Sequence, residues 1–295
     1  IDINAELLPD GSASITEIWD IDAWDGTEWY LVKNNLGDIK IKDFSVSENG
    51  KIFRIRPDGS ARTQLTAVSG STLTCYKGYL YFSASDGIYR ISAAEAGPDT
   101  EPECVYREET EAAPARYWMQ FSEDGRLFFS GGADGGLYEV RTADGVNDLI
   151  PLCPTETEVY FFQIDGSELY FDVLIGDRIY LQMLDLETGK FRAVIRDYFS
   201  YTAAYCVRDG FLYFEGYRLD ASEASTDIGL YRLNLSADSE KPEFLFEIPE
   251  SELHISDMYA EANGLYCYYS DGKTNGRHQL IRYALPELDK PQTIF

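Results

Sequence analysis

Histidine is nearly absent from this chain, in which only His254 and His278 occur among 295 residues. A hydrolase with a serine nucleophile needs a histidine base beside that serine. The sequence also has no Gly-x-Ser-x-Gly turn, which would present such a serine at the end of a strand. We therefore interpret both histidines as residues of the surface or rim. We predict no catalytic residue and no enzymatic activity.

Basic side chains are scarce relative to acidic ones, with 25 Lys and Arg against 51 Asp and Glu, which gives a formal net charge of -26. Binding of nucleic acid depends on basic side chains that neutralise phosphates, so we exclude a nucleic-acid partner. The same negative charge disfavours anionic lipid surfaces. It would suit a cationic ligand, although solubility alone also explains it.

Long apolar runs and closely spaced cysteines are missing as well. No stretch of about 18 apolar residues occurs, so we predict no membrane-spanning segment. The absence of a Cys-x-x-Cys pair excludes zinc ribbons and thioredoxin-like redox sites, and the odd number of cysteines leaves no complete disulfide framework. We expect free thiols, most of them buried in strands, at Cys75, Cys104, Cys153, Cys206 and Cys267.

Tyrosine is abundant, with 22 residues, and much of it belongs to an internal repeat. A leucine flanked by aromatic residues follows a tight turn and recurs at intervals of roughly 40 to 50 residues. A second strand pattern follows each copy, and further short strands precede and follow each pair. The central leucines of the repeat are Leu80, Leu127, Leu169, Leu212 and Leu265.

Four short strands per repeat are typical of the blades of a β-propeller, in which stacked sheets cover each other's apolar faces. Asp-Gly pairs such as Asp124-Gly125 and Asp209-Gly210 readily adopt the positive φ angles that two-residue hairpin turns require. No segment shows sustained helical periodicity. We therefore predict an all-β fold, a β-propeller of four-stranded blades with almost no helix.

The number of blades allows two interpretations. The first is a six-bladed propeller over 26–295 with an N-terminal β-hairpin extension at 1–25. Its blades would lie at 26–70, 71–114, 115–157, 158–200, 201–253 and 254–295. The alternative is five blades preceded by a β-sandwich fragment over about the first 48 residues, which the clustering of Trp19, Trp24 and Trp29 favours.

Residues 50–91 resemble a known type of bacterial propeller. The segment Gly50-Lys-Ile-Phe-Arg-Ile-Arg-Pro-Asp-Gly-Ser60 is followed by Gln64-Leu-Thr66 and Tyr79-Leu-Tyr-Phe82. This order is similar to that of bacterial β-propellers of unknown function related to the low-density-lipoprotein-receptor-like and TolB-like propellers. The resemblance implies a secreted or envelope-attached binding scaffold. It specifies the fold and says little about the ligand.

Residues 1–48 resemble the start of a different family, an extracytoplasmic β-sandwich of unknown function found on bacterial membrane proteins. The likeness rests on Leu8-Pro-Asp-Gly-Ser-Ala-Ser-Ile-Thr-Glu-Ile-Trp19 and Ile41-Lys-Asp-Phe-Ser-Val46. The remainder of that domain is missing here. Because the chain begins with Ile1 and not with methionine, we expect that a leader was removed or that the sequence was trimmed.

Function is expected on one loop face, formed by the loops before each first strand and between the two central strands of each blade. We define the loop face by these segments, which include 173–177, 197–202, 215–228 and 249–254. Four residues near such loops would suit a ligand or protein contact, although we favour packing along a channel wall as the explanation for them. They are Arg116, Tyr117, Trp118 and Tyr201.

Three functions fit this interpretation. The first is an extracytoplasmic binding propeller that engages a protein or glycan, the second a carbohydrate-active hydrolase that uses channel carboxylates, and the third a structural spacer of an envelope protein. We expect a monomer. The acidic turn Asp144-Gly-Val-Asn-Asp148 is the best candidate for calcium, but its spacing does not match an EF-hand loop. No cofactor is therefore predicted.

Overall fold

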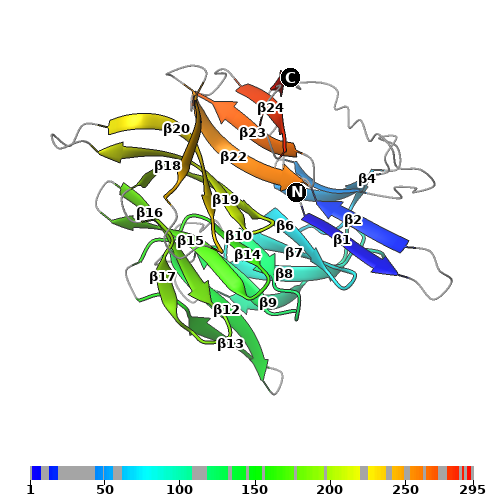
Figure 1. Cartoon of the computed structure of the whole chain (residues 1–295). Helices are drawn as coiled ribbons and strands as arrows, with labels where there is room; N and C mark the ends of the chain where they lie inside the picture. The colour runs from blue at the N-terminus through cyan, green and yellow to red at the C-terminus, as the bar shows by residue number, and fades with distance from the viewer. Residues whose placement is uncertain are drawn as a thin grey trace. The chain divides into compact units, whose positions relative to one another are not determined.

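The computed structural model has an all-β architecture (Figure 1). The residues that the structure describes lie in strands, turns and loops, with no helix among them, so none of them forms a helix that could span a membrane. The described residues are 2–7, 13–18, 44–48, 50–55, 62–107, 118–131, 135–143, 146–154, 157–175, 178–195, 198–219, 225–236, 241–248, 253–261, 264–271, 278–285, 288 and 291–293.

The first of two compact units comprises Ile1–Glu156. It begins with an antiparallel hairpin of β1 (Asp2–Leu7) and β2 (Ala13–Ile18). A three-stranded sheet and two four-stranded sheets follow, each with its strands in sequence order. Their strands are β3 (Phe44–Glu48), β4 (Lys51–Ile55), β5 (Thr63–Gln64), β6 (Ser71–Tyr76), β7 (Tyr79–Ala84), β8 (Gly87–Ser92), β9 (Glu103–Arg107), β10 (Trp118–Phe121), β11 (Leu127–Gly131), β12 (Gly136–Ala143) and β13 (Val146–Pro151).

The second unit comprises Thr157–Phe295 and contains an eight-stranded and a four-stranded sheet. The eight-stranded sheet consists of two groups of four strands, which are joined at the register pair of Ile179 and Ser200. The strands are β14 (Phe162–Asp165), β15 (Glu168–Ile175), β16 (Arg178–Asp185), β17 (Phe191–Ala193), β18 (Phe199–Arg208), β19 (Phe211–Leu219), β20 (Ser225–Asn234), β21 (Glu243–Glu247), β22 (His254–Glu261), β23 (Gly264–Ser270), β24 (His278–Ala284) and β25 (Gln292–Thr293).

These sheets are the six predicted blades of a β-propeller. The groups β6–β9, β10–β13, β14–β17, β18–β21 and β22–β25 are antiparallel meanders of four strands, as expected. The group β3–β5 supplies three described strands of the first blade. The predicted start of that blade at residue 26 lies outside the described residues, so the proposed boundary to an N-terminal extension stays a prediction.

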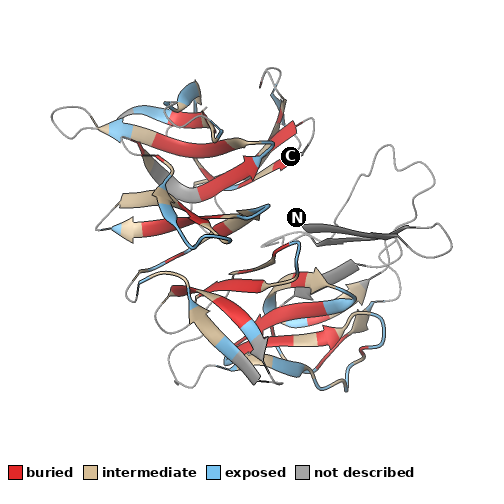
Figure 2. Cartoon of the chain, turned by 60° about the horizontal axis from the view of Figure 1, so that its bottom comes forward, coloured by how far each residue is buried: buried red, intermediate tan, exposed pale blue. Residues whose placement is uncertain are grey.

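Successive blades bury their apolar faces against one another within each unit. In the first unit, Ile52 and Leu65 pack with Leu80 and Phe82 of the next blade. In the second unit, one cluster joins β15 and β16 to β18 and β19, and another joins the β18–β21 blade to the β22–β25 blade. Figure 2 shows the buried residues running along the strands. Neither face of a strand so rich in Leu, Tyr and Phe can remain in water, which explains the stacking.

The repeated motif supplies the centre of this core. The leucines Leu80, Leu169, Leu212 and Leu265 are completely buried, and Leu127 is 5% exposed. Tyrosine is also suited to this core, because its ring packs against apolar neighbours while its hydroxyl bonds to a polar group. The hydroxyl of Tyr205, for example, donates to the backbone oxygen of Tyr170 over 2.9 Å.

The turn prediction is confirmed at Asp209-Gly210, where both residues have positive φ angles, 51° and 76°, as a type I′ hairpin between β18 and β19 requires. At Asp124-Gly125 only Gly125 has a positive φ angle, 89°, and the connection from Ser122 to Arg126 is longer than a two-residue turn.

All five cysteines are free, as expected, but the expectation that most are buried was wrong: Cys104 is exposed, and Cys75 and Cys153 are half-buried. Cys206 and Cys267 are buried, and burial raises the pKa of both thiols, so they are inert apolar groups at neutral pH.

Candidate functional site

In four successive blades, a buried polar residue follows the apolar motif of the second strand. Ser83, Ser130, Asp172 and Glu215 each follow the Leu-aromatic-aromatic motif directly, on β7, β11, β15 and β19. Their exposed fractions are 3%, 1%, 0% and 0%. A buried carboxylate is costly unless it is hydrogen-bonded, so the two acidic members need a specific environment. Both lie in the second unit, at the loop face.

Asp172 holds the backbone that leads into β14. Its Oδ1 accepts the N–H groups of Tyr160 and Phe161, each over 2.9 Å. Its Oδ2 is buried and has no hydrogen-bond partner among the described residues. Burial raises the pKa of Asp172 to about 7, against the opposing effect of the two N–H donors. This acid therefore carries a proton for part of the time at neutral pH.

Glu215 connects two neighbouring blades. One of its oxygens accepts the backbone N–H of Ile255 at the start of β22, and the other lies 3.1 Å from Nδ1 of His254. The imidazole of His254 is 36% exposed, whereas Glu215 is fully buried. Burial raises the pKa of Glu215, and the hydrogen bonds from Ile255 and His254 oppose that effect. The buried acid thus fixes the ring of a half-exposed histidine at the loop face.

The position of His254 repeats along the chain. It precedes its central leucine, Leu265, by as many residues as Tyr201 precedes Leu212 and Arg116 precedes Leu127. This equivalence holds for the sequence spacing alone. In the paired strands His254 lies opposite Ser270, five residues after Leu265, whereas the residue opposite Tyr217, five residues after Leu212, is Phe199 and not Tyr201. Ser270 also pairs with His278. The interpretation of His254 as a rim residue did not foresee its buried carboxylate partner.

Three aromatic side chains form a row across β16, β18 and β19, also at the loop face. We call Tyr180, Phe199 and Tyr217 the aromatic row. The rings of Tyr180 and Phe199 lie 5.3 Å apart at 85°, and those of Phe199 and Tyr217 lie 5.7 Å apart at 39°. The guanidinium of Arg178 lies 5.1 Å from the centre of the Phe199 ring. All four side chains are partly exposed.

Backbone pairing explains this row. Ser200 pairs with Ile179 on one side and with Gly216 on the other, so β18 begins between strands of two blades. Tyr180 and Phe199 are then cross-strand neighbours, and Phe199 pairs directly with Tyr217. Residues at such positions have Cβ atoms about 5 Å apart, which is close enough for ring contact.

Two further exposed side chains lie at the same end of this sheet. Arg218 follows Tyr217, and because successive side chains of a strand point to opposite faces, it lies on the face away from the aromatic row, where its guanidinium is 5.3 Å from the ring centre of Tyr198. Ile175 ends β15 opposite Arg178 and is 58% exposed. A single exposed apolar side chain is common on protein surfaces and is not by itself evidence of a contact surface.

The structure describes only part of the predicted site. Arg116 and Tyr117 lie outside the described residues. Trp118 begins β10, is half-buried, and pairs with Ser130. Tyr201 lies in β18, and its side chain is outside the description. The four residues are therefore not brought together here, and their role stays a prediction.

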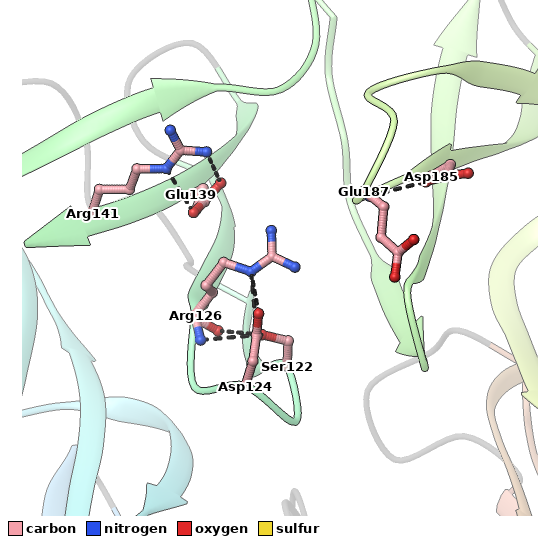
Figure 3. A network of polar contacts seen from close by, with 7 residues as sticks. All are labelled: Ser122, Asp124, Arg126, Glu139, Arg141, Asp185 and Glu187. Carbon is pink, nitrogen blue, oxygen red and sulfur yellow. Dashed lines mark hydrogen bonds and ion pairs between the residues drawn. The ribbon is translucent and has the colours of Figure 1, made fainter.

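Several polar contacts have a structural role. Figure 3 shows Asp124 bonded to both Ser122 and Arg126 in the turn before β11, and Arg141 bonded to Glu139 on β12. Figure 3 also shows the turn of the second unit in which Asp185 accepts the N–H of Glu187. These bonds satisfy polar groups of two turns and the buried carboxylate of Glu139.

Within the described parts of the chain, no three metal-ligating side chains cluster. Of the acidic turn that was the calcium candidate, Asp144 and Gly145 lie outside those parts, and the remaining residues begin β13.

Solved structures with the same fold were found, whereas no protein-family model and no curated protein match the chain. A puromycin hydrolase matches 99% of this chain and 51% of its own, with a TM-score of 0.64 and 11% identity. A putative TolB from Agrobacterium tumefaciens matches 79% of this chain and 82% of its own, with a TM-score of 0.53 and 12% identity.

The extracellular domain of a putative one-component system from B. thetaiotaomicron matches 99% of this chain and 45% of its own, with a TM-score of 0.55 and 11% identity. The chain thus spans about half the length of the puromycin hydrolase. These likenesses confirm the expected propeller fold, and the similar structures include a TolB. At such identities they concern the fold alone, because one fold hosts many functions.

Proposed function

We propose that this chain is an extracytoplasmic binding propeller that engages a protein or glycan through its loop face, and that it is not an enzyme. The observation that carries the proposal is the aromatic row, which is partly exposed on β16, β18 and β19 together with the guanidinium of Arg178 that lies over Phe199. Tyr and Arg are enriched in recognition surfaces because they offer large contact area and directional hydrogen bonds.

The buried acids support binding over catalysis. The hydrolase alternative needs a carboxylic acid that reaches a substrate. Asp172 and Glu215 have the raised pKa values that such an acid would show, but both are fully buried and both accept backbone N–H groups at strand entries. In our proposal they anchor the loop face and make no contact with a substrate.

A location outside the cytoplasm is part of the proposal. It is supported by the sequence resemblance to secreted or envelope-attached scaffolds and by the fold shared with the extracellular domain from B. thetaiotaomicron. A structural spacer would share this location, but it would not need half-exposed rings and arginines on one end of its blades.

The proposal is tested by screening the full chain against glycan and peptide arrays with a matched pair of charge reversals. Arg218→Glu alters the loop face, whereas Arg208→Glu alters the opposite end of the same sheet, where Arg208 pairs with Phe211. We expect a bound ligand whose signal is lost in Arg218→Glu and kept in Arg208→Glu. Equal binding by both variants, or no ligand on either array, would overturn the proposal.

A further inference from the structure

We propose that the aromatic row binds a neutral, β-linked glycan, with its sugar rings against Tyr180 and Tyr217 and its hydroxyls bonded to Arg178. This inference rests on the proposed function and names the ligand class. It starts from the geometry of the row, whose adjacent ring centres lie 5.3 and 5.7 Å apart with their planes at 85° and 39°, so that Tyr180 and Tyr217 would contact separate sugars and do not form one flat platform. A glycan with equatorial substituents presents an apolar C–H face on each sugar, and such a face packs against an aromatic ring as other apolar groups do.

Arg178 adds the polar part of the recognition. Its guanidinium lies over Phe199, 5.1 Å from the ring centre, and this contact holds the charged group near the row before a ligand binds. Sugars need such donors because each hydroxyl that loses water on binding must find another partner. The phenol groups of Tyr180 and Tyr217 add further donors and acceptors along the row. Apolar rings and polar groups therefore lie together along the aromatic row, as is typical of sites that fix the orientation of a bound ligand.

The charges of the chain favour a neutral ligand over a charged one at the aromatic row. The chain carries a net charge of -26, which repels an acidic polysaccharide at long range. The cation on the row itself, Arg178, repels a basic peptide at short range. A neutral glycan meets neither barrier. Because such a ligand carries no charge, its affinity should depend little on salt.

The row also has a fixed shape before any ligand arrives. Phe199 is held between two strands through the pairing of Ser200 with Ile179 and Gly216. In the same unit, the buried carboxylate of Asp172 fixes the backbone entering β14, the first strand of the blade that contributes Tyr180. A preformed surface loses less entropy on binding than a mobile loop does.

Isothermal titration of the full chain with cellohexaose, xylohexaose and chitohexaose tests the inference, with maltohexaose and hexagalacturonate as α-linked and acidic comparisons. We expect binding of at least one β-linked hexamer, no measurable binding of the two comparisons, and less than a twofold change in affinity between low and physiological salt. Tyr217→Ala and Tyr180→Ala should each weaken binding by about tenfold. The control Phe191→Ala, at a residue 48% exposed on β17, should leave the affinity unchanged.

A second pair of variants separates a ring contact from general destabilisation. Tyr217→Leu keeps an apolar side chain without a ring and should lose affinity, whereas Tyr217→Trp should keep it. Equal affinity of Tyr217→Leu and wild type would overturn the inference. Binding of a peptide or of hexagalacturonate through Arg218 would also overturn it, while leaving the proposed function in place. If no ligand binds at all on the arrays or by titration, both proposals fail.

Discussion

Glu215 and Ile255 lie on neighbouring blades, and the buried carboxylate of Glu215 accepts the backbone N–H of Ile255. The pairing of β22 with β23 shifts register just beyond this point, between Ile255 and Asp257. A register shift leaves backbone groups without ladder partners. The acid therefore supplies an acceptor where the sheet cannot, and it binds the entry of one blade to the core of another.

Removal of this carboxylate should destabilise the fold. Glu215→Ala leaves the N–H of Ile255 buried without an acceptor and creates a cavity, so we expect the free energy of unfolding to fall by about 2–4 kcal/mol in urea titrations. Glu243→Ala, which removes an exposed ion pair with Arg232, should cost less than about 1 kcal/mol. Similar losses in the two variants would contradict the anchoring role of Glu215.

The contact between Glu215 and His254 should appear as a coupling energy. A double-mutant cycle with Glu215→Gln and His254→Gln, measured by urea unfolding, should give a coupling of about 1–3 kcal/mol, because a buried charged group meets its partner at 3.1 Å. The exposed pair of Arg208 and Asp209 serves as the matched cycle and should give about 0.5 kcal/mol or less. Coupling near zero in the first cycle would show that His254 does not interact with the acid.

Asp172 should make stability depend on pH. Its pKa rises from 3.8 to about 7 on folding because burial disfavours the charged form. Between these values the folded state keeps a proton that the unfolded state has lost, so stability falls as pH rises from about 4 to about 7 and then levels off. Asp172→Asn has no such titration, and its free energy of unfolding relative to wild type should rise by up to roughly 4 kcal/mol across that range.

The measurement for Asp172 is a series of urea unfolding curves from pH 4 to pH 8 for wild type, Asp172→Asn and the control Asp99→Asn. Asp99 is exposed in a loop, so its variant should follow the wild-type curve at every pH. The unpartnered Oδ2 becomes an amide nitrogen in Asp172→Asn, which adds a penalty that does not vary with pH. A constant difference between Asp172→Asn and wild type would refute a raised pKa.

The repeat made the fold predictable from the sequence, but it did not indicate the contacts between blades that form the candidate site. Leucine-aromatic strands and Asp-Gly turns depend on neighbours close in sequence, so their pattern could be read directly. The contact of Glu215 with His254 joins two blades and depends on the register at the start of β22. One signal was present: an acid follows the aromatic pair in Phe171-Asp172 and Phe214-Glu215, where the copies at Leu80 and Leu127 have serine.

The aromatic row was less accessible to sequence reasoning. Phe199 and Tyr217 fall within segments predicted to form the loop face, but the contact of Phe199 with Tyr180 requires β18 to pair with a strand of the preceding blade at Ile179. A repeat pattern describes each blade by itself and carries no information on pairing between blades. The sequence-based choice of Arg116, Tyr117, Trp118 and Tyr201 as contact residues stays a prediction.

Gly210 tests the turn chemistry that supports the repeat. It follows Asp209 in the hairpin between β18 and β19 and has a φ angle of 76°, which residues with a Cβ atom adopt only with strain. Gly210→Ala should therefore lower the free energy of unfolding by about 1 kcal/mol or more, although no backbone atom crowds the site.

Gly97 offers the matched control, because it has open space and an ordinary φ angle. Gly97→Ala should be neutral or stabilising by up to about 1 kcal/mol, since it restricts the unfolded chain alone. Thermal and urea unfolding of the two variants would separate these cases, and equal effects would mean that the turn does not require glycine.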